Sequence, residues 1–119
     1  MKHLGAYFND HTLKASVLEK ILAHQQLEQI VQGETGENGT GCLIWCGLGV
    51  YDHQGYAQAF NVPIIIPYLG EHLFEQSPTG DSVAIPYKFM EAIPVGASWE
   101  AMERVWPKFC VKMLRPQRS

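Results

Sequence analysis

The stretch Asn9-Asp-His-Thr-Leu-Lys-Ala-Ser-Val-Leu-Glu-Lys-Ile-Leu-Ala-His-Gln-Gln-Leu-Glu-Gln-Ile-Val-Gln-Gly33 decides the fold class of this chain. Asn9 and Asp10 are good helix caps and Gly33 is a typical helix stop, so the stretch predicts a helix that starts after Asp10 and runs to about Gln32. His24 falls in the middle of its apolar side, as either a hydrogen-bonded core histidine or a site histidine. The apolar residues of that side recur at helical spacing: Leu13, Val17, Ile21, Leu27 and Val31.

Two short apolar runs further along leave the choice between helix and strand open. Periodicity cannot separate a buried helix from a buried strand over Cys42–Val50, although the glycines at 47 and 49 resemble a helix stop. Val62–Pro67 holds three consecutive β-branched residues and is the most strand-like run, yet its prolines could also begin a helix that ends near Gln76. We therefore predict a mostly α-helical fold of five or six helices. A short strand pair of residues 42–50 and 62–67 is the main alternative.

Three more helices complete the predicted set. Asp52 can cap a short helix through residue 60, and a second short helix is expected from about Pro86 to Ile93 after a turn at Ser77–Gly80. The last predicted helix, residues 98–113, carries an aromatic stripe that is typical of a core. The stripe consists of Trp99, Met102, Trp106, Phe109 and Met113.

Composition limits the function classes. The 119 residues are expected to form a single domain, 1–119, with residues 115–119 as a flexible tail. A net charge of −3 argues against a nucleic-acid binder, and no apolar run approaches the length of a membrane span. Three cysteines do not make a secreted disulfide framework, and the N-terminus lacks a signal-peptide pattern, so we predict a cytoplasmic protein.

The segment from Gly33 to Gly55 is the first place to look for a site, because it holds seven of the eleven glycines, two thiols and a histidine. A Cys-His hydrolase would use Cys42 as the nucleophile, with His53 and His24 as the candidate histidines. A metal site would use Cys42, Cys46 and His53, since a helix would place both thiols on one face. The alternative is that both cysteines have no chemical role and pack in the core as small hydrophobic residues.

No motif predicts a cofactor or an established metal site. The glycine-rich run 36–41 fails the phosphate-loop pattern because Cys42 stands where lysine is needed. The cysteine and histidine spacings match no zinc motif, so no metal is predicted. Glu71 and Glu75 are interpreted as a solvated helix edge.

The order of several short blocks resembles a family of small uncharacterised bacterial proteins, of the kind found among phage and integron gene-cassette products. The resemblance spans residues 18–114 and implies no established activity. The blocks are Ala23-His24, Glu37-Asn-Gly-x-Gly-Cys-x-x-x-Cys46, Asp52-His-x-x-Tyr56, Val62-Pro63, Leu73-Phe-Glu75, Ala92-Ile-Pro-Val-Gly-Ala97 and Val105-Trp-Pro-Lys-Phe109.

This chain departs from the family pattern at several polar positions. Gly49 stands where the pattern has histidine, and Ala57 and Ala59 replace acidic residues. The Leu-Glu-Asp step of the pattern is Leu69-Gly-Glu71 in this chain. Trp45 fills a position that is small in the pattern. The losses favour a binding or packing role over catalysis.

The leading hypothesis is therefore a small soluble protein that works by binding, as a homo-oligomer. Three tryptophans, ten other aromatic residues and the run Ile64–Ile66 exceed what one small core easily buries, and surplus apolar surface marks interfaces. A protein or small-molecule ligand fits the acidic composition better than nucleic acid does. Under either hypothesis, His24 and His53 are expected to approach the Cys42–Cys46 segment.

Overall fold

A computed structural model describes residues 4–98 of the chain, and helices dominate it. The mostly α-helical prediction is confirmed, while the predicted helix 98–113 and the tail 115–119 extend beyond the described residues. No helix within residues 4–98 is long and apolar enough to cross a membrane. In chain order the elements are η1 (Ala6–Asn9), α1 (His11–Gln26), α2 (Leu43–Leu48), α3 (His53–Phe60), α4 (Ile65–Gln76), α5 (Thr79–Ser82) and α6 (Ile85–Ala92).

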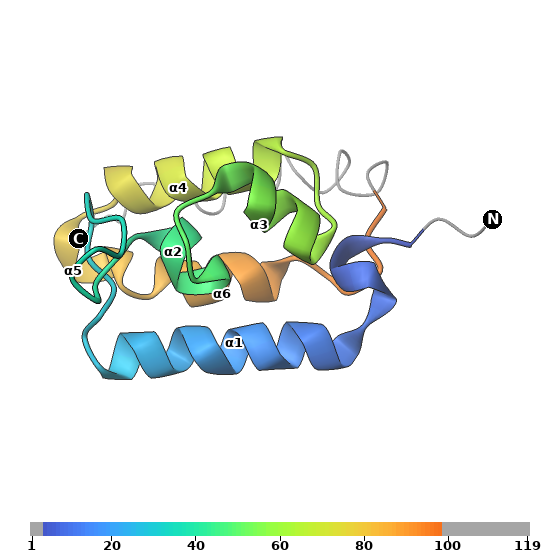
Figure 1. Cartoon of the computed structure of the whole chain (residues 1–119), viewed down its shortest axis with the longest axis horizontal. Helices are drawn as coiled ribbons and strands as arrows, with labels where there is room; N and C mark the ends of the chain where they lie inside the picture. The colour runs from blue at the N-terminus through green and yellow to red at the C-terminus, as the bar shows by residue number, and fades with distance from the viewer. Residues whose placement is uncertain (1–3, 99–119) are drawn as a thin grey trace, which may run out of the picture.

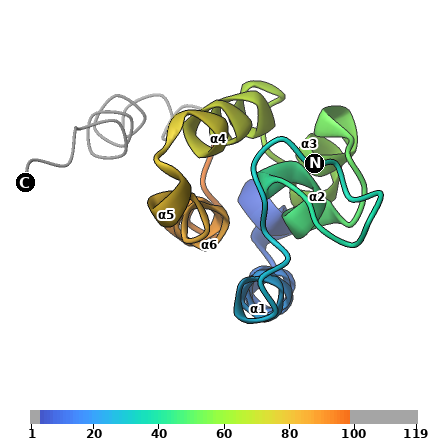
Figure 2. The same ribbon diagram turned by 90° about the vertical axis from the view of Figure 1, so that its left-hand side faces the viewer.

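The two longest helices, α1 and α4, lie at opposite edges of the fold, with α2 and α6 between them (Figures 1 and 2). Helix α2 contacts α1 on one side and α4 on the other, and α6 does the same. Helix α3 packs against α2 and α4. The short α2 therefore presents different residues to two facing helices, and this position organises the site described below.

Helix α1 begins as predicted but ends six residues early. The Asp10 carboxylate accepts hydrogen bonds from the backbone N–H groups of Thr12 and Leu13, which confirms the cap. The helix stops at Gln26 because the chain turns at Glu28, whose φ is +57°. The turn lets Ile30 become buried and pair with Gly41, so Leu27 and Val31 are exposed rather than part of the helix side.

The strand alternative is wrong for both ambiguous runs. Residues 43–48 form α2, which ends at Gly49 with a φ of +97°, the left-handed conformation that glycine adopts without a Cβ penalty. The second run starts α4, where Pro67 occupies the first turn and its missing N–H costs nothing. The helix ends at Gln76, as the helical interpretation predicts. Pairing within residues 4–98 is limited to isolated bridges, Ile30 with Gly41 and Thr35 with Gly41.

The other short elements follow the predicted pattern closely. Asp52 caps α3 by accepting a hydrogen bond from the Gly55 N–H. Helix α6 matches the predicted helix within one residue at each end. The predicted turn before it contains one extra helical turn, α5. The segment 33–41 is a loop, as its four glycines predict.

The close contact between α4 and α6 depends on a glycine, Gly70. A Cβ atom placed on Gly70 of α4 would lie 2.7 Å from the Phe89 ring of α6 and 3.1 Å from the Leu43 side chain. Absence of that atom lets Phe89 pack against the α4 backbone. Large, fully buried side chains of the core come from six elements: Tyr7, Ile21, Leu43, Ile44, Tyr56, Ile66, Leu73, Phe74, Phe89 and Met90.

The chain enters the fold through an unusual left-handed turn. Tyr7, Phe8 and Asn9 all have φ between 53° and 60°. Such a conformation costs about 1–2 kcal/mol per residue. The buried Tyr7 hydroxyl donates a 2.6 Å hydrogen bond to the Met90 carbonyl, and Ala6 pairs through its backbone with the segment 96–97. These contacts hold the turn in place.

Candidate functional site

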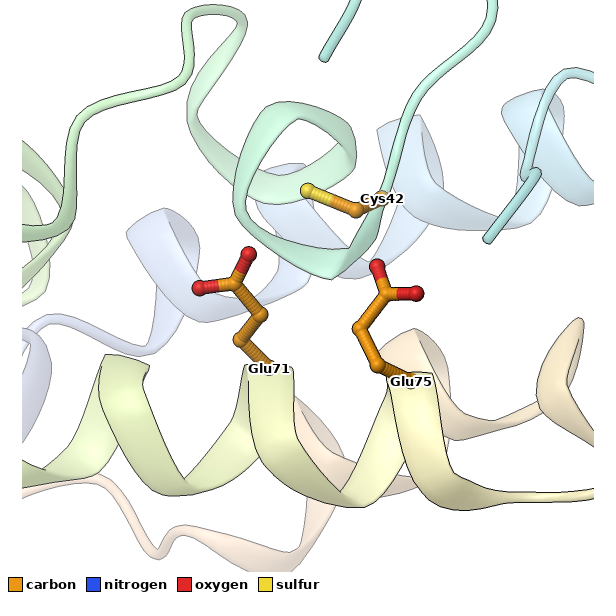
Figure 3. Close-up of side chains that lie close together, drawn as sticks. All are labelled: Cys42, Glu71 and Glu75. Atoms are coloured by element: carbon orange, nitrogen blue, oxygen red, sulfur yellow. The ribbon is translucent and has the colours of Figure 1, made fainter. Parts of the chain in front are cut away.

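Three potential ligand side chains meet where α2 faces α4. Glu71 and Glu75 project from α4 toward Cys42, which lies at the start of α2 (Figure 3). The Cys42 Sγ atom and one carboxylate oxygen from each glutamate lie within 4.8 Å of one another. Glu71 and Glu75 are neighbours because residues four apart share a helix face. The fold brings together residues that are about thirty positions apart in the sequence.

Cys42 carries a buried thiol that lies beside two carboxylates. The Cys42 residue is 1% exposed. Burial raises the pKa of the Cys42 thiol, the backbone N–H groups of Trp45 and Ile44 oppose part of that rise, and the two carboxylates add to it. The thiol form is therefore favoured over the thiolate, which is the opposite of what an activated nucleophile needs.

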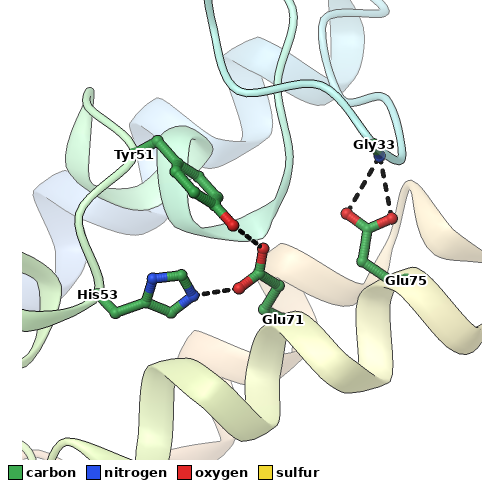
Figure 4. A network of polar contacts seen from close by, with 5 residues as sticks. All are labelled: Gly33, Tyr51, His53, Glu71 and Glu75. Atoms are coloured by element: carbon green, nitrogen blue, oxygen red, sulfur yellow. Dashed lines mark hydrogen bonds and ion pairs between the residues drawn. The ribbon is translucent and has the colours of Figure 1, made fainter.

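Glu71 is fixed by Tyr51 of the α2–α3 connection and by His53, the first residue of α3 (Figure 4). The Tyr51 hydroxyl donates to Oε1 over 2.7 Å, and His53 Nε2 contacts Oε2. The hydrogen bond to Glu71 raises the pKa of Tyr51 to about 12. The His53 ring stacks on Tyr68 of α4, with centroids 4.3 Å apart and planes 11° from parallel. Both oxygens of Glu71 thus have a partner.

Glu75 is held from the opposite side by the glycine-rich loop. The Gly33 N–H donates to both carboxylate oxygens, over 2.9 and 3.1 Å (Figure 4). The same loop reaches Cys42, whose N–H donates to the Glu34 carbonyl over 3.0 Å. The loop therefore positions one carboxylate and the thiol together.

The second thiol and the second histidine form a separate pair. His24 Nδ1 lies 3.2 Å from Cys46 Sγ, and the imidazole stacks on Trp45 with centroids 4.7 Å apart. Burial lowers the pKa of His24, and Lys20 lowers it further. Burial raises the pKa of Cys46 to about 12. Both groups are neutral at neutral pH, as in a packed core contact.

The structure thus divides the predicted site residues between two places. His24 reaches Cys46, as expected, whereas His53 reaches Cys42 only through Glu71. The expectation that both thiols share a helix face is wrong, because Cys42 is the N-cap and has extended backbone, with ψ at −172°. Cys46 instead faces α1.

Neither the residues predicted for a Cys-His hydrolase nor those predicted for a metal site come together as such a site would need. Among residues 4–98, no histidine is hydrogen-bonded to Cys42, so the nucleophile–base pair of a Cys-His hydrolase is not assembled. Cys42, Cys46 and His53 do not converge as metal ligands either. The residues that do converge on Cys42 include Glu71 and Glu75, which the sequence interpretation placed on a solvated edge; both are half-buried. Their spacing of four residues predicts that the two glutamates share a helix face, but nothing in the sequence indicates that this face lies against Cys42.

A second surface feature lies on α3 and α4. A shallow pocket of about 520 Å³ is lined by the carboxamides of Gln54, Gln58 and Asn61 and by Val62, Ile64 and Tyr68, and no lining residue is charged. Ile64 is 47% exposed, Ile65 48% and Tyr68 55%. We call Gln54, Gln58, Ile64, Ile65 and Tyr68 the α3–α4 face.

Comparisons of the chain with protein-family models, curated proteins and solved structures found no match.

Proposed function

We propose that this protein is a cytoplasmic binding protein that works as a homo-oligomer, with a second copy seated on the α3–α4 face. The carrying observation is the row of exposed apolar side chains at the start of α4, Ile64, Ile65 and Tyr68. Fully burying side chains of this size contributes about 1.5–3 kcal/mol each. Contiguous exposed apolar side chains of this kind mark interaction surfaces.

The charge of the face favours a second copy as its occupant. In a two-fold dimer the same patch lies against itself, so a charged patch would repel its copy. The residues that line the pocket between α3 and α4 carry no charge. The amides of Gln54 and Gln58 can both donate and accept hydrogen bonds, so they can pair across a two-fold axis.

The state of Cys42 supports binding over hydrolysis. A cysteine nucleophile needs a lowered thiol pKa and a histidine within hydrogen-bond reach. Burial and the carboxylates of Glu71 and Glu75 act in the other direction on Cys42. His53, the nearer of the predicted histidines in sequence, is engaged by Glu71.

Sedimentation velocity at micromolar concentration tests the proposal. The wild-type chain is expected to sediment as a dimer or larger oligomer, and Ile64→Glu as a monomer. An acidic residue is tolerated at the start of α4 because it suits the positive end of the helix dipole. Leu27→Glu is the matched control, since Leu27 is 68% exposed but lies at the end of α1. A monomeric wild type, or equal dissociation in both variants, contradicts the proposal.

A further inference from the structure

The side chains between α2 and α4 have an unbalanced charge. Two carboxylates lie beside a buried thiol, with one oxygen of each and the Cys42 Sγ within 4.8 Å of one another. Within residues 4–98, the polar contacts that offset the repulsion between these carboxylates come from hydrogen-bond donors: Tyr51 and His53 on Glu71, and the Gly33 N–H on Glu75. Among the side chains of these contacts, none comes from Lys or Arg.

The buried thiol is a second observation that points to a ligand. Cys42 is 1% exposed, and among residues 4–98 its thiol has the backbone N–H groups of Trp45 and Ile44 beside it but no side-chain partner. Its side chain extends from the start of α2 and lies close to the two carboxylates that project from α4 (Figure 3). A cation between the three groups would bond to the sulfur as well as to the carboxylates, and would neutralise the carboxylate charge.

We propose that Cys42, Glu71 and Glu75 bind one Zn²⁺ ion. Zinc accepts sulfur and oxygen ligands together, with bonds of about 2.3 Å to sulfur and about 2.0–2.2 Å to oxygen. In a tetrahedral site these bonds place ligand atoms roughly 3.3–3.8 Å apart. The three ligand atoms lie within 4.8 Å of one another, which exceeds this range by about 1 Å, so metal binding requires them to move closer together. On binding, the thiol releases its proton to solvent and the sulfur bonds to the metal.

The mixed ligand set selects zinc over harder cations. Magnesium and calcium prefer oxygen ligands throughout, and a thiolate in the set disfavours them. Three protein ligands leave the fourth tetrahedral position to water, the arrangement found in zinc sites that are open to a further ligand.

The outer contacts are suited to such a site. Tyr51 and His53 fix the orientation of Glu71, and the Gly33 N–H fixes Glu75. These are positioning residues in the zinc site, because outer partners of a ligating carboxylate orient it toward the metal. The zinc proposal uses no residue of the α3–α4 face, so its test is independent of the test of oligomerisation.

Zinc binding is tested on the full chain after chelator treatment, by titration calorimetry with Zn²⁺ and by absorption with Co²⁺. We expect one Zn²⁺ per chain and a sulfur-to-cobalt charge-transfer band. Glu71→Gln and Glu75→Gln keep side-chain size and are expected to weaken Zn²⁺ binding at least about 10-fold, and Tyr51→Phe about 10-fold. Cys42→Ala should abolish the charge-transfer band.

Matched controls separate this site from adventitious binding. Cys46→Ala removes an equally buried thiol that faces His24, and Glu19→Gln removes an exposed carboxylate of α1. Both are expected to bind Zn²⁺ and Co²⁺ like the wild type, with far-ultraviolet circular dichroism confirming that every variant is folded. The proposal is overturned if the wild type fails to bind Zn²⁺ at submillimolar concentration, or if the glutamine variants bind as tightly as Glu19→Gln.

Discussion

His24 Nδ1 lies 3.2 Å from Cys46 Sγ, and this contact joins α1 to α2 with both groups neutral. Burial lowers the pKa of the imidazole and raises the pKa of the thiol to about 12. The pair therefore differs from the thiolate–imidazolium pair of a cysteine hydrolase, although it consists of the same two residue types. Its pH response follows from this state.

Acid is expected to destabilise the fold through His24. The pKa of His24 in the folded chain lies below its ordinary value of 6.5, so the unfolded chain takes up the proton first as pH falls. The contribution of His24 is fully present above about pH 6.5 and is lost as pH falls through the folded pKa. Urea unfolding from about pH 7.5 to pH 5 measures this. His24→Gln should flatten the slope, whereas His72→Gln, at an exposed position, should not.

Native Cys42 and Cys46 are expected to resist alkylation at neutral pH. Both thiols are buried and have raised pKa values, so the reactive thiolate is scarce and poorly accessible. Iodoacetamide labelling followed by peptide mass spectrometry distinguishes the two sites. Labelling should become fast only after unfolding in urea. Fast labelling of Cys42 in the folded chain would contradict the state described for it and restore the hydrolase hypothesis.

Gly70→Ala is expected to lower the free energy of unfolding by about 1–3 kcal/mol. The added methyl group would lie 2.7 Å from the Phe89 ring and force the crossing of α4 and α6 apart. Gly80→Ala adds the same methyl group in α5, where nothing lies within 4 Å, and should be neutral or slightly stabilising. Chemical denaturation of the two variants gives the comparison, and equal effects would show that the crossing is not tightly packed.

Gln32→Ala should destabilise the end of α4. The Gln32 side-chain amide donates 2.7 Å hydrogen bonds to the carbonyls of Phe74 and Ser77. Removing the amide leaves two carbonyls without that donor, at a cost of about 1–3 kcal/mol. Hydrogen exchange of α4 amides and the unfolding free energy report the loss. Gln26→Ala, at an exposed position of α1, is the control and should change stability little.

The sequence predicts most helices because their signals are local. Asp10 and Asp52 cap helices where their positions indicate, and the glycine-rich loop is recognisable from composition alone. The early end of α1 was not predictable, because it depends on Ile30 pairing with Gly41, a contact made across the loop. Likewise, the run of three isoleucines has the local propensity of a strand, and tertiary packing makes it the start of a helix.

The candidate site was predictable only in part for the same reason. Cys42 and His53 stand out as reactive residue types near glycines, and both belong to the cluster. Glu71 and Glu75 have the spacing of an ordinary helix surface, and their meaning depends on which helix faces them. The prediction that Cys46 shares a site with Cys42 assumed a helical backbone at residue 42. Cys42 is instead the N-cap of α2 and has an extended backbone.

The backbone pairing of Ala6 with residues 96 and 97 has a consequence for the order of folding. The Ala6 N–H donates to the Ala97 carbonyl, and the Gly96 N–H donates to the Ala6 carbonyl. Closing a flexible loop of about ninety residues costs roughly 4 kcal/mol in chain entropy, which is more than the about 1–3 kcal/mol that two hydrogen bonds return. The pairing can therefore form only after α1 docks on α6 and shortens that loop. We expect these two bonds to be among the last to form in refolding and among the first to open.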